Sequence, residues 1–335
     1  MKIQYGVSLR SHNTLGFESR AQALAEADSL LSLRRVLAIG RHRFSRVIAL
    51  GGGSNVVMNP DIEGLVVRYT GQRIWQKFLG PNKALWHVEA GVNWHALVEK
   101  TTREGWWGIE NLALIPGSVG AAPIQNIGAY GTEIGDVIES VHVVHLENGR
   151  YEILDRAQCD FGYRHSVFKT ALAGKVMVVR VVLRLDLDGR PRTGYGDLAE
   201  RLPENAGPDD VAIAVAAIRR RKLPDPLVLG NAGSFFKNPV VPAEQAEALI
   251  TRFPSMPFWK TDQGTKLAAG WMIDQCGWKG YRDNRVGVHQ QQALVLVHYG
   301  QGRVSDLLEL AMRIRESVEV RFGVTIDMEP GIIGH

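Results

Sequence analysis

Residues 115–131 read "IPGSVGAAPIQNIGAYG", and this stretch decides how the fold of the chain is interpreted. Glycine, alanine and proline dominate it, with Ser118, Gln125 and Asn126 spaced between them. Residues without a bulky side chain let the backbone approach a ligand closely, and glycine also permits positive φ. The stretch therefore predicts a loop that wraps a flat or extended ligand.

A second glycine run, "LGGGSN" at 50–55, follows the expected strand "RVIAL" at 46–50. Successive unobstructed backbone N–H groups, with Ser54 and Asn55 beside them, can converge on anionic oxygens. The run lacks the glycine spacing of a Rossmann dinucleotide site, and neither segment contains the lysine of a P-loop. Together the two segments indicate a pyrophosphate cradle for a cofactor larger than a mononucleotide.

Length and composition exclude several classes of protein. The 335 residues exceed the roughly 250 to 300 at which a single core stops growing, so two or three domains are expected. The net charge of +4 does not argue for nucleic-acid binding. No apolar run approaches the roughly 18 residues of a membrane span, and the amino terminus lacks a signal-peptide core, which predicts a cytoplasmic protein. Cys159 and Cys276 have no spacing typical of a disulfide framework or a zinc site, so no metal is expected.

Hydrophobic patterns predict a mixture of helices and strands without internal repeats. Residues 21–38 read as a helix, and 85–107 read as strand, glycine turn and helix. Residues 137–154 read as a hairpin, in which Asn148-Gly149 favours a type I′ turn. The carboxy-terminal third is expected to contain helices at 242–253, 266–276 and 304–322, a strand at 292–297 and a closing strand at 324–330.

Two further stretches leave alternatives open. "GNAGSFFKNP" at 230–239 sets the hydroxyl of Ser234 between Gly233 and two phenylalanines, which suits either a shielded reaction centre or an ordinary packed loop. "IRRRKLPDP" at 218–226 gathers four cations before two prolines. Such a cluster can meet a phosphorylated or carboxylated small molecule, or it can be a solvated helix end.

The motifs taken together resemble the UDP-N-acetylenolpyruvoylglucosamine reductase family of bacterial peptidoglycan synthesis. They appear in family order from residue 13 to residue 334, and they are "NTLG" (13–16), "LGGGSN", "IPGSVGAAPIQNIGAYG", "YRHSVFK" (163–169), "YGDL" (195–198), "KLPDP" (222–226), "GNAGSFFKNP", "AGWMIDQCG" (269–277) and a carboxy-terminal Glu. The tyrosine motif matches the longer form of the family.

The resemblance implies an α+β fold with a two-part FAD-binding region of the vanillyl-alcohol-oxidase/PCMH type and a third, α+β substrate-binding domain. The expected boundaries are 1–72 and 73–222 for the two FAD-binding subdomains, 223–322 for the substrate-binding domain, and 323–335 for a terminal segment carrying the catalytic Glu. It implies a monomer that acts on small molecules, with neither nucleic acid nor membrane as partner.

The cofactors implied are noncovalent FAD and, as hydride donor, NADPH. The family motifs match FAD-binding positions at Gly51, Gly52, Gly53, Ser54, Asn55, Pro116, Gly117, Ser118, Gly120, Ala121, Ala122, Ile124, Asn126, Gly128, Ala129, Tyr130 and Arg219.

By the same matches, Ser234, Arg164 and Glu329 are the catalytic residues. Ser234 is the acid that protonates the substrate carbon, while Arg164 grips the carboxylate with its fork of donors and Glu329, if protonated, hydrogen-bonds the developing enolate. Substrate-binding positions match Tyr195, Lys222, Asn238, Lys279 and Gln292.

Two departures from the family pattern concern the catalytic positions. His165 stands where the family usually has Asp, and the order Met328-Glu329-Pro330 leaves the choice between Asp327 and Glu329 dependent on alignment. Two other functions explain part of the pattern: a flavoprotein oxidase with the same FAD clamp, and a binding protein that keeps the fold without turnover.

Overall fold

The computed structural model describes residues 2–194 and 198–334, and these form two compact units. The first unit comprises Met1–Val7, Ala21–Gly53 and Glu63–Arg219. The second comprises Ser8–Arg20, Ser54–Ile62 and Arg220–His335. The chain therefore passes between units within the "LGGGSN" motif. The finer boundaries expected from the sequence stay predictions.

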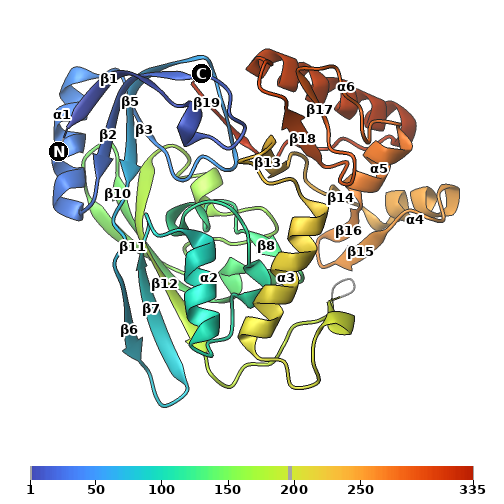
Figure 1. Cartoon of the computed structure of the whole chain (residues 1–335), viewed down its shortest axis with the longest axis horizontal. Coiled ribbons are helices and arrows are strands. Elements are labelled where there is room, and N and C mark those ends of the chain that lie inside the picture. Colours follow the sequence, from blue (N-terminus) through green and yellow to red (C-terminus); the bar gives the residue numbers. More distant parts are fainter. Residues whose placement is uncertain (1, 195–197, 335) are drawn as a thin grey trace. The chain divides into compact units, whose positions relative to one another are not determined.

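The first unit contains a four-stranded sheet with the order β1-β2-β5-β3 (Figure 1). Its strands are β1 (Ile3–Ser8), β2 (Arg20–Ala27), β5 (Asp61–Tyr69) and β3 (Val47–Ala49). The strand expected at 46–50 is thus confirmed as β3, which runs parallel to β5. The chain enters the glycine run directly from β3, so this strand positions Gly51.

The single helix expected at 21–38 is wrong in its first half. Residues 20–27 form strand β2, and α1 (Leu30–Arg43) begins only after Ser29. Every second residue from Ala21 to Ala27 is buried, which is the period of a strand that faces a core. The Ser29 side chain caps the helix by accepting from the Ser32 backbone N–H.

A five-stranded antiparallel sheet, β11-β10-β12-β7-β6, forms the centre of the first unit. The strands are β11 (Tyr151–Asp155), β10 (Ile138–His145), β12 (Val176–Asp186), β7 (Lys83–Glu89) and β6 (Ile74–Phe78). One face buries alternate residues such as Trp86, Val141 and Val181 in the core. The expected strand, turn and helix at 85–107 are confirmed as β7 and α2 (Trp94–Arg103).

The expected hairpin at 137–154 is confirmed as β10 and β11, but its turn is not type I′. That turn needs positive φ at both central residues, and of the pair Asn148-Gly149 only Gly149 has it, at 73°. The longer turn is closed by a 2.8 Å hydrogen bond from the Gly149 N–H to the His145 carbonyl.

Short elements and one long helix complete the first unit. The helix is α3 (Pro208–Lys222), which ends in the cationic cluster. The short elements are η2 (Glu110–Leu112), η3 (Val119–Ala121), β8 (Gly128–Ala129), β9 (Thr132–Glu133), η4 (Ile134–Asp136), η5 (Val167–Lys169) and η6 (Ala199–Arg201).

The second unit is built from three small sheets and three helices. The sheets are β13-β18-β17 (Gly230–Ser234, Val295–His298, Val286–Val288), β14-β16-β15 (Val240–Val241, Gly264–Leu267, Phe258–Thr261) and the parallel pair β19-β4 (Gly331–Ile333, Val56–Met58). The helices α4 (Ala243–Arg252), α5 (Ala269–Gln275) and α6 (Val304–Phe322) are confirmed, and η1 is Arg10–His12.

Two strand predictions in this unit need adjustment. The strand expected at 292–297 is found as β18, a few residues later than expected. The closing strand expected at 324–330 is wrong, because this segment makes only an isolated bridge between Met328 and Phe236 and the regular strand begins at Gly331.

Two remaining findings concern the cysteines and the helices. Cys159 is buried, Cys276 is half-buried, and both are free thiols. Within 2–194 and 198–334, no helix combines the length and the apolar character that crossing a membrane requires.

Candidate active site

The glycine run at Gly51–Gly53 lies against the 116–131 segment in the first unit, and we call these two segments the cofactor cradle. A Cβ built on Gly52 would lie 2.9 Å from the Cα of Gly117, and one built on Gly51 would lie 3.2 Å from the Cβ of Ala121. Real Cβ atoms essentially never approach backbone as closely as 3.0 Å. The two backbones thus meet at a distance that only glycine allows, so their amides are available to one ligand.

Backbone hydrogen bonds fix the cradle to the loop between β7 and α2. Trp94 N–H donates to the Gly117 carbonyl at 3.0 Å, and the N–H groups of Val119 and Gly120 donate to the Val92 and Ala90 carbonyls at 2.9 Å. A Cβ on Gly120 would lie 2.5 Å from that of Ala90. This close approach explains why position 120 is a glycine and position 90 an alanine.

His95 holds Leu114, which lies two residues before the 116–131 segment of the cradle. The sequence analysis did not identify His95. Its Nδ1 accepts a 3.1 Å hydrogen bond from the backbone N–H of Leu114, a leucine with a φ of 59°. A leucine in the left-handed region is strained, so the bond helps to hold this conformation. A histidine nitrogen can accept only when it carries no proton, so Nδ1 is deprotonated here.

Asn126, a predicted FAD contact, uses its side chain inside the protein. Its φ is 49°, its Nδ2 donates to Glu133 Oε2 at 2.5 Å and to the Gly162 carbonyl at 3.0 Å, and its Oδ1 accepts from Gly135 N–H at 2.8 Å. Its amide therefore fixes the loop that ends in Gly128 and Tyr130. Glu133 is the second supporting residue that sequence reasoning missed.

Arg164 and Arg219 bring positive charge close to the cradle. Arg164 Nη2 donates to the Gly128 carbonyl at 3.1 Å, and its guanidinium lies 5.4 Å from the centre of the Tyr163 ring. The buried Nε of Arg219 has no hydrogen-bond partner among the residues that the structure describes. Burial lowers the pKa of Arg219, Tyr130 raises it and the charge of Arg164 lowers it, so these three side chains are neighbours.

The departure at His165 has a direct structural outcome. His165 Nε2 lies 3.2 Å from Asp160 Oδ2, while Arg164 is positioned by the carbonyl of Gly128. The φ of Arg164 is 53°, so this residue also adopts the left-handed region. His165 thus pairs with Asp160. Arg164 is instead held by the Gly128 carbonyl, which belongs to the cradle.

These observations fit a bound FAD. The close approach of two glycine backbones leaves amides for a pyrophosphate, and the orphaned Nε of Arg219 beside Arg164 leaves positive charge that an anionic group can satisfy.

Ser234 and Glu329 adjoin one another in the second unit. Glu329 N–H donates to the Phe235 carbonyl at 2.9 Å, and Lys237 N–H donates to the Asp327 carbonyl at 2.9 Å. The Glu329 side chain belongs to a buried residue, 8% exposed, whereas Asp327 is exposed. Of the two candidate acids, Glu329 is therefore the buried one, and its backbone pairs with Phe235, the residue after Ser234.

The loop around Ser234 combines a turn with an apolar wall. Gly233 has a φ of 69°, and its N–H donates to Asn231 Oδ1 at 2.9 Å, which fixes the turn. The Ser234 hydroxyl makes no hydrogen bond to any part of the chain that the structure describes. Phe235 and Phe236 are 0% and 1% exposed and pack edge to face, so both form core beside the hydroxyl.

The end of the glycine motif lies beside Glu329. Asn55 Nδ2 is 3.5 Å from the Glu329 carbonyl oxygen, and Gly331 N–H donates to the Asn55 carbonyl at 3.2 Å. Ser54 and Asn55 thus belong with the catalytic candidates of the second unit, while Gly51–Gly53 belong to the cradle of the first.

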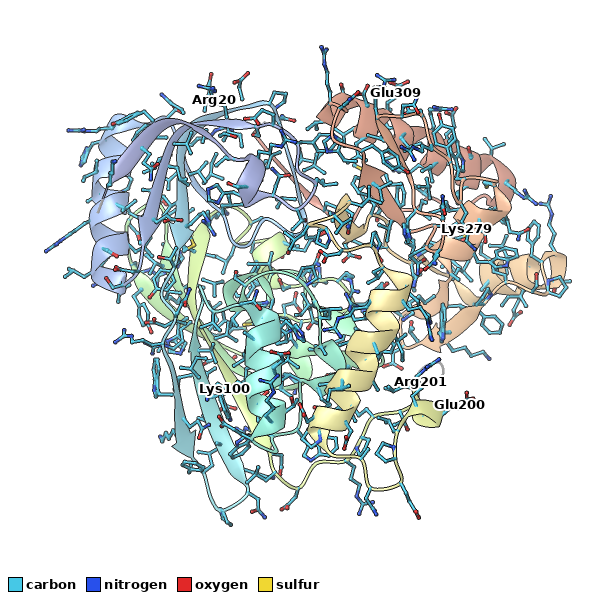
Figure 2. All side chains as sticks on the ribbon, viewed as in Figure 1. Arg20, Lys100, Glu200, Arg201, Lys279 and Glu309 are labelled. Carbon is cyan, nitrogen blue, oxygen red and sulfur yellow. The ribbon has the colours of Figure 1, made fainter. Side chains whose placement is uncertain are left out.

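The predicted substrate residues fall into two groups. Asn238 Oδ1 accepts from the first N–H of α5 at 3.0 Å, and Gln292 Oε1 would lie 3.4 Å from a Cβ on Gly270, so both lie at the start of α5. Lys222 and Lys279 are exposed, and Lys279 pairs with Asp274 at 3.1 Å on the surface (Figure 2). Tyr195 lies outside the described residues.

Comparisons with known proteins decide the family. The model described as UDP-N-acetylenolpyruvoylglucosamine reductase, C-terminal domain, matches residues 225–333, and a model described as FAD binding domain matches 21–155. The UDP-N-acetylenolpyruvoylglucosamine reductase of Chromobacterium violaceum is 46% identical over 99% of both chains, and that of Cupriavidus pinatubonensis is 48% identical over 97% of both. The chain belongs to the UDP-N-acetylenolpyruvoylglucosamine reductase family.

A solved structure agrees with this assignment. The crystal structure of UDP-N-acetylenolpyruvylglucosamine reductase from Thermus caldophilus is 26% identical, covers 99% of each chain and has a TM-score of 0.70. The α+β fold with an FAD-binding region is therefore confirmed, and the chain is a flavin-dependent oxidoreductase of the reductase family.

Proposed function

We propose that this member of the reductase family converts UDP-N-acetylglucosamine enolpyruvate into UDP-N-acetylmuramate, with NADPH as hydride donor and FAD as cofactor, in bacterial peptidoglycan synthesis. Relatives with this name match nearly the whole chain. Within the second unit, the backbone pairing of Glu329 with Phe235, the residue after Ser234, supports the proposal, because it places a buried acidic residue on the segment that pairs with the Ser234 loop.

The overall reaction adds one hydride and one proton across the carbon–carbon double bond of an enolpyruvyl ether. Bound FAD supplies hydride transfer. Ser234 donates its hydroxyl proton to the carbon that bears the carboxylate. Phe235 and Phe236 exclude water from that hydroxyl, since both are fully buried.

Arg164 and Glu329 stabilise negative charge on the substrate. Arg164 offers a planar set of donors that matches a carboxylate, and the Gly128 carbonyl holds it in orientation. Glu329, in its protonated form, donates a hydrogen bond to the oxygen on which charge develops.

FAD is held by the cradle, with Ser54, Asn55 and Arg219, without a covalent bond. The residues that hold it are those matched to the family: Gly51, Gly52, Gly53, Ser54, Asn55, Pro116, Gly117, Ser118, Gly120, Ala121, Ala122, Ile124, Asn126, Gly128, Ala129, Tyr130 and Arg219. No histidine or cysteine occurs within 50–55 or 115–131 to form such a bond. Acid precipitation should therefore release yellow flavin into the supernatant, and a flavin that remained in the pellet would contradict this.

The nucleotide part of the substrate is bound by Tyr195, Lys222, Asn238, Lys279 and Gln292. The two exposed lysines offer point charges to the diphosphate. Asn238 and Gln292 lie at one end of α5, where their amides can fix the orientation of a polar group. The enzyme works as a cytoplasmic monomer with domains at 1–72, 73–222 and 223–322 and a terminal segment at 323–335.

The test is NADPH oxidation that depends on UDP-N-acetylglucosamine enolpyruvate, measured without oxygen. We expect one NADPH consumed for each UDP-N-acetylmuramate detected by mass. An oxidase for another substrate would instead show no NADPH consumption that depends on this nucleotide, and an inactive binding protein would stay yellow without turnover.

A further inference from the structure

The face of the five-stranded sheet opposite to Trp86, Val141 and Val181 carries a cluster of four side chains that are not part of the cofactor cradle. In the strand register, Trp75 lies opposite His87, Arg180 lies opposite His142 and Glu89, and Val182 lies opposite His87. Because side chains alternate along a strand, Trp75, His87, His142 and Arg180 share one face, while Trp86, Val141 and Val181 point to the core. We call these four residues the open-face cluster, and their strands β6, β7, β12 and β10 are labelled in Figure 1.

Arg180 has no counterion in the part of the chain that the structure describes. Its side chain makes no hydrogen bond or ion pair there, and its buried Nε lacks any partner. Its guanidinium carbon lies 4.5 Å from the centre of the Trp75 ring. A half-buried charge without a partner costs free energy, so a bound anion would stabilise this arginine.

The acid that faces Arg180 is already engaged. Glu89 Oε1 accepts from Arg73 Nε at 3.1 Å and from Arg73 Nη2 at 2.9 Å, and its Oε2 accepts from the Arg73 backbone N–H at 2.9 Å. The next outward arginine on the same strand, Arg184, pairs with Glu139 at 2.6 Å. The sheet therefore satisfies its other arginines from within and leaves Arg180 unsatisfied.

Two histidines flank Arg180, and burial holds both in the neutral form. His87 stacks on Trp75 with ring centres 5.1 Å apart, and its buried Nδ1 has no partner within the described residues. His142 contacts the Tyr151 hydroxyl through Nδ1 and lies 3.3 Å from the Ser140 hydroxyl through Nε2. Burial first, and the charge of Arg180 second, lower the pKa of both, that of His142 to about 4.

We propose that the open-face cluster binds a phosphate-sized oxyanion. Arg180 Nε is a buried donor without an acceptor, His87 Nδ1 is a buried ring nitrogen without a partner that donates when the ring is protonated, and guanidinium donors suit a tetrahedral oxyanion. The anion supplies the negative charge that this face lacks. None of the four residues belongs to the cradle or to the positions proposed for substrate.

Anion binding at this site strengthens as the pH falls. A bound anion favours the protonated form of His87 and His142, so by linkage each proton taken up tightens binding. The other charged or titratable groups that share this face or contact it are Lys77, Arg73 with Glu89, Arg184 with Glu139, Lys83 with Asp186, Asp155, Tyr69 and Tyr151. Glu89, Glu139 and Asp186 are paired with cations, Asp155 accepts from the Gln158 backbone N–H at 2.8 Å, and Lys77 adds to the positive field at His87.

The test uses sulfate as the probe, because its charge does not change between about pH 6 and pH 8. The FAD-loaded protein is titrated by calorimetry at constant ionic strength in chloride. We expect saturable binding that weakens from pH 6 to pH 8. Arg180→Met should weaken it about tenfold or more, as loss of charge-assisted hydrogen bonds implies, and Arg184→Met is the matched control that should change it less than about twofold.

The control experiments keep the outcome decisive. Flavin content and NADPH oxidation should match the unaltered protein in both variants, which excludes unfolding. Should Arg180→Met perturb the fold, Arg180→Lys, which keeps the charge and loses the planar donors, should still weaken sulfate binding. Equal sulfate affinity in the Arg180 and Arg184 variants, or no saturable binding by the unaltered protein, would overturn the proposal.

Discussion

The backbone N–H of Glu329 donates a 2.9 Å hydrogen bond to the carbonyl oxygen of Phe235. This bond links the end of the chain to the residue that follows Ser234, although nearly a hundred residues separate them in sequence. Beside it, Met328 bridges to Phe236. The local pairing thus joins the segment of the buried Glu329 to the loop of Ser234, whose hydroxyl has no protein partner within the described residues.

Replacing Ser234 by alanine should separate the two halves of the reaction. The hydroxyl has no part in flavin reduction by NADPH, so anaerobic bleaching should proceed at nearly the unaltered rate. Product formation should slow by roughly 10² to 10⁴, the usual contribution of a general acid. Stopped-flow absorbance measures the first step, and rapid-quench product analysis measures the second.

The control for this experiment is Ser255→Ala, which removes an exposed hydroxyl from the same unit. It should leave both steps unchanged. If Ser234→Ala loses its flavin, or if both steps slow equally, Ser234 is a packing residue of the loop and the acid lies elsewhere.

Glu329→Gln should lower kcat far more than Asp327→Asn. Both changes remove one carboxyl group two residues apart, but Glu329 is buried and Asp327 is exposed. Loss of a group that stabilises developing charge costs roughly 10² to 10³ in rate. Steady-state kinetics with the enolpyruvyl nucleotide measures the difference. Equal losses in the two variants would mean that Glu329 has no special role.

The sequence alone predicted the elements whose pattern is local. Helix α6 begins and ends at the expected residues, since its apolar face repeats at helical spacing from Val304 to Phe322. The cradle was also predictable, because no side chain except glycine fits where Gly52 meets Gly117. The alanine-rich strand β2 was read as helix because alanine favours helices, whereas its burial follows a period of two.

Features that depend on strand register could not be predicted. Arg180 lies opposite Glu89, which is bound to Arg73, and the sequence does not show which strands pair. His95 supports Leu114 from the first turn of a helix, and a lone histidine there carries no motif. Asn126 was predicted as a cofactor contact, yet its amide is used by Glu133 and its neighbours.

Gly52→Ala should weaken FAD retention. The new Cβ would lie 2.9 Å from backbone Cα of Gly117, so the two segments of the cradle must move apart. The purified variant should show a lower ratio of flavin to protein absorbance and a near-native circular dichroism spectrum. Gly207→Ala is the control, because its Cβ would make only an ordinary contact of 3.7 Å with Asp210. Full flavin content in Gly52→Ala would show that the cradle tolerates the added methyl group.

His298→Asn should reduce the pH dependence of stability. His298 Nδ1 contacts the Leu15 carbonyl at 2.8 Å and its Nε2 accepts from Gly302 N–H at 3.1 Å, an arrangement that requires the neutral ring. Burial is the main reason that its pKa is lowered. The unfolded chain therefore takes up a proton first as the pH falls below its usual value of about 6.5, and the free energy of unfolding decreases from there down to the folded-state pKa.

Denaturant unfolding of the FAD-loaded protein at pH 8 and pH 5.5 measures this contribution. Between pH 8 and pH 5.5, the free energy of unfolding of the unaltered protein should fall. The fall is up to about 1.4 kcal/mol for each pH unit between the unfolded-state and folded-state pKa of His298 that lies in this range. In His298→Asn this part of the loss should disappear, and stability at pH 8 should be lower because the stacking on Phe17 is gone. His42→Asn, at an exposed histidine, should keep the full dependence. An unchanged pH dependence in His298→Asn would show that other groups account for it.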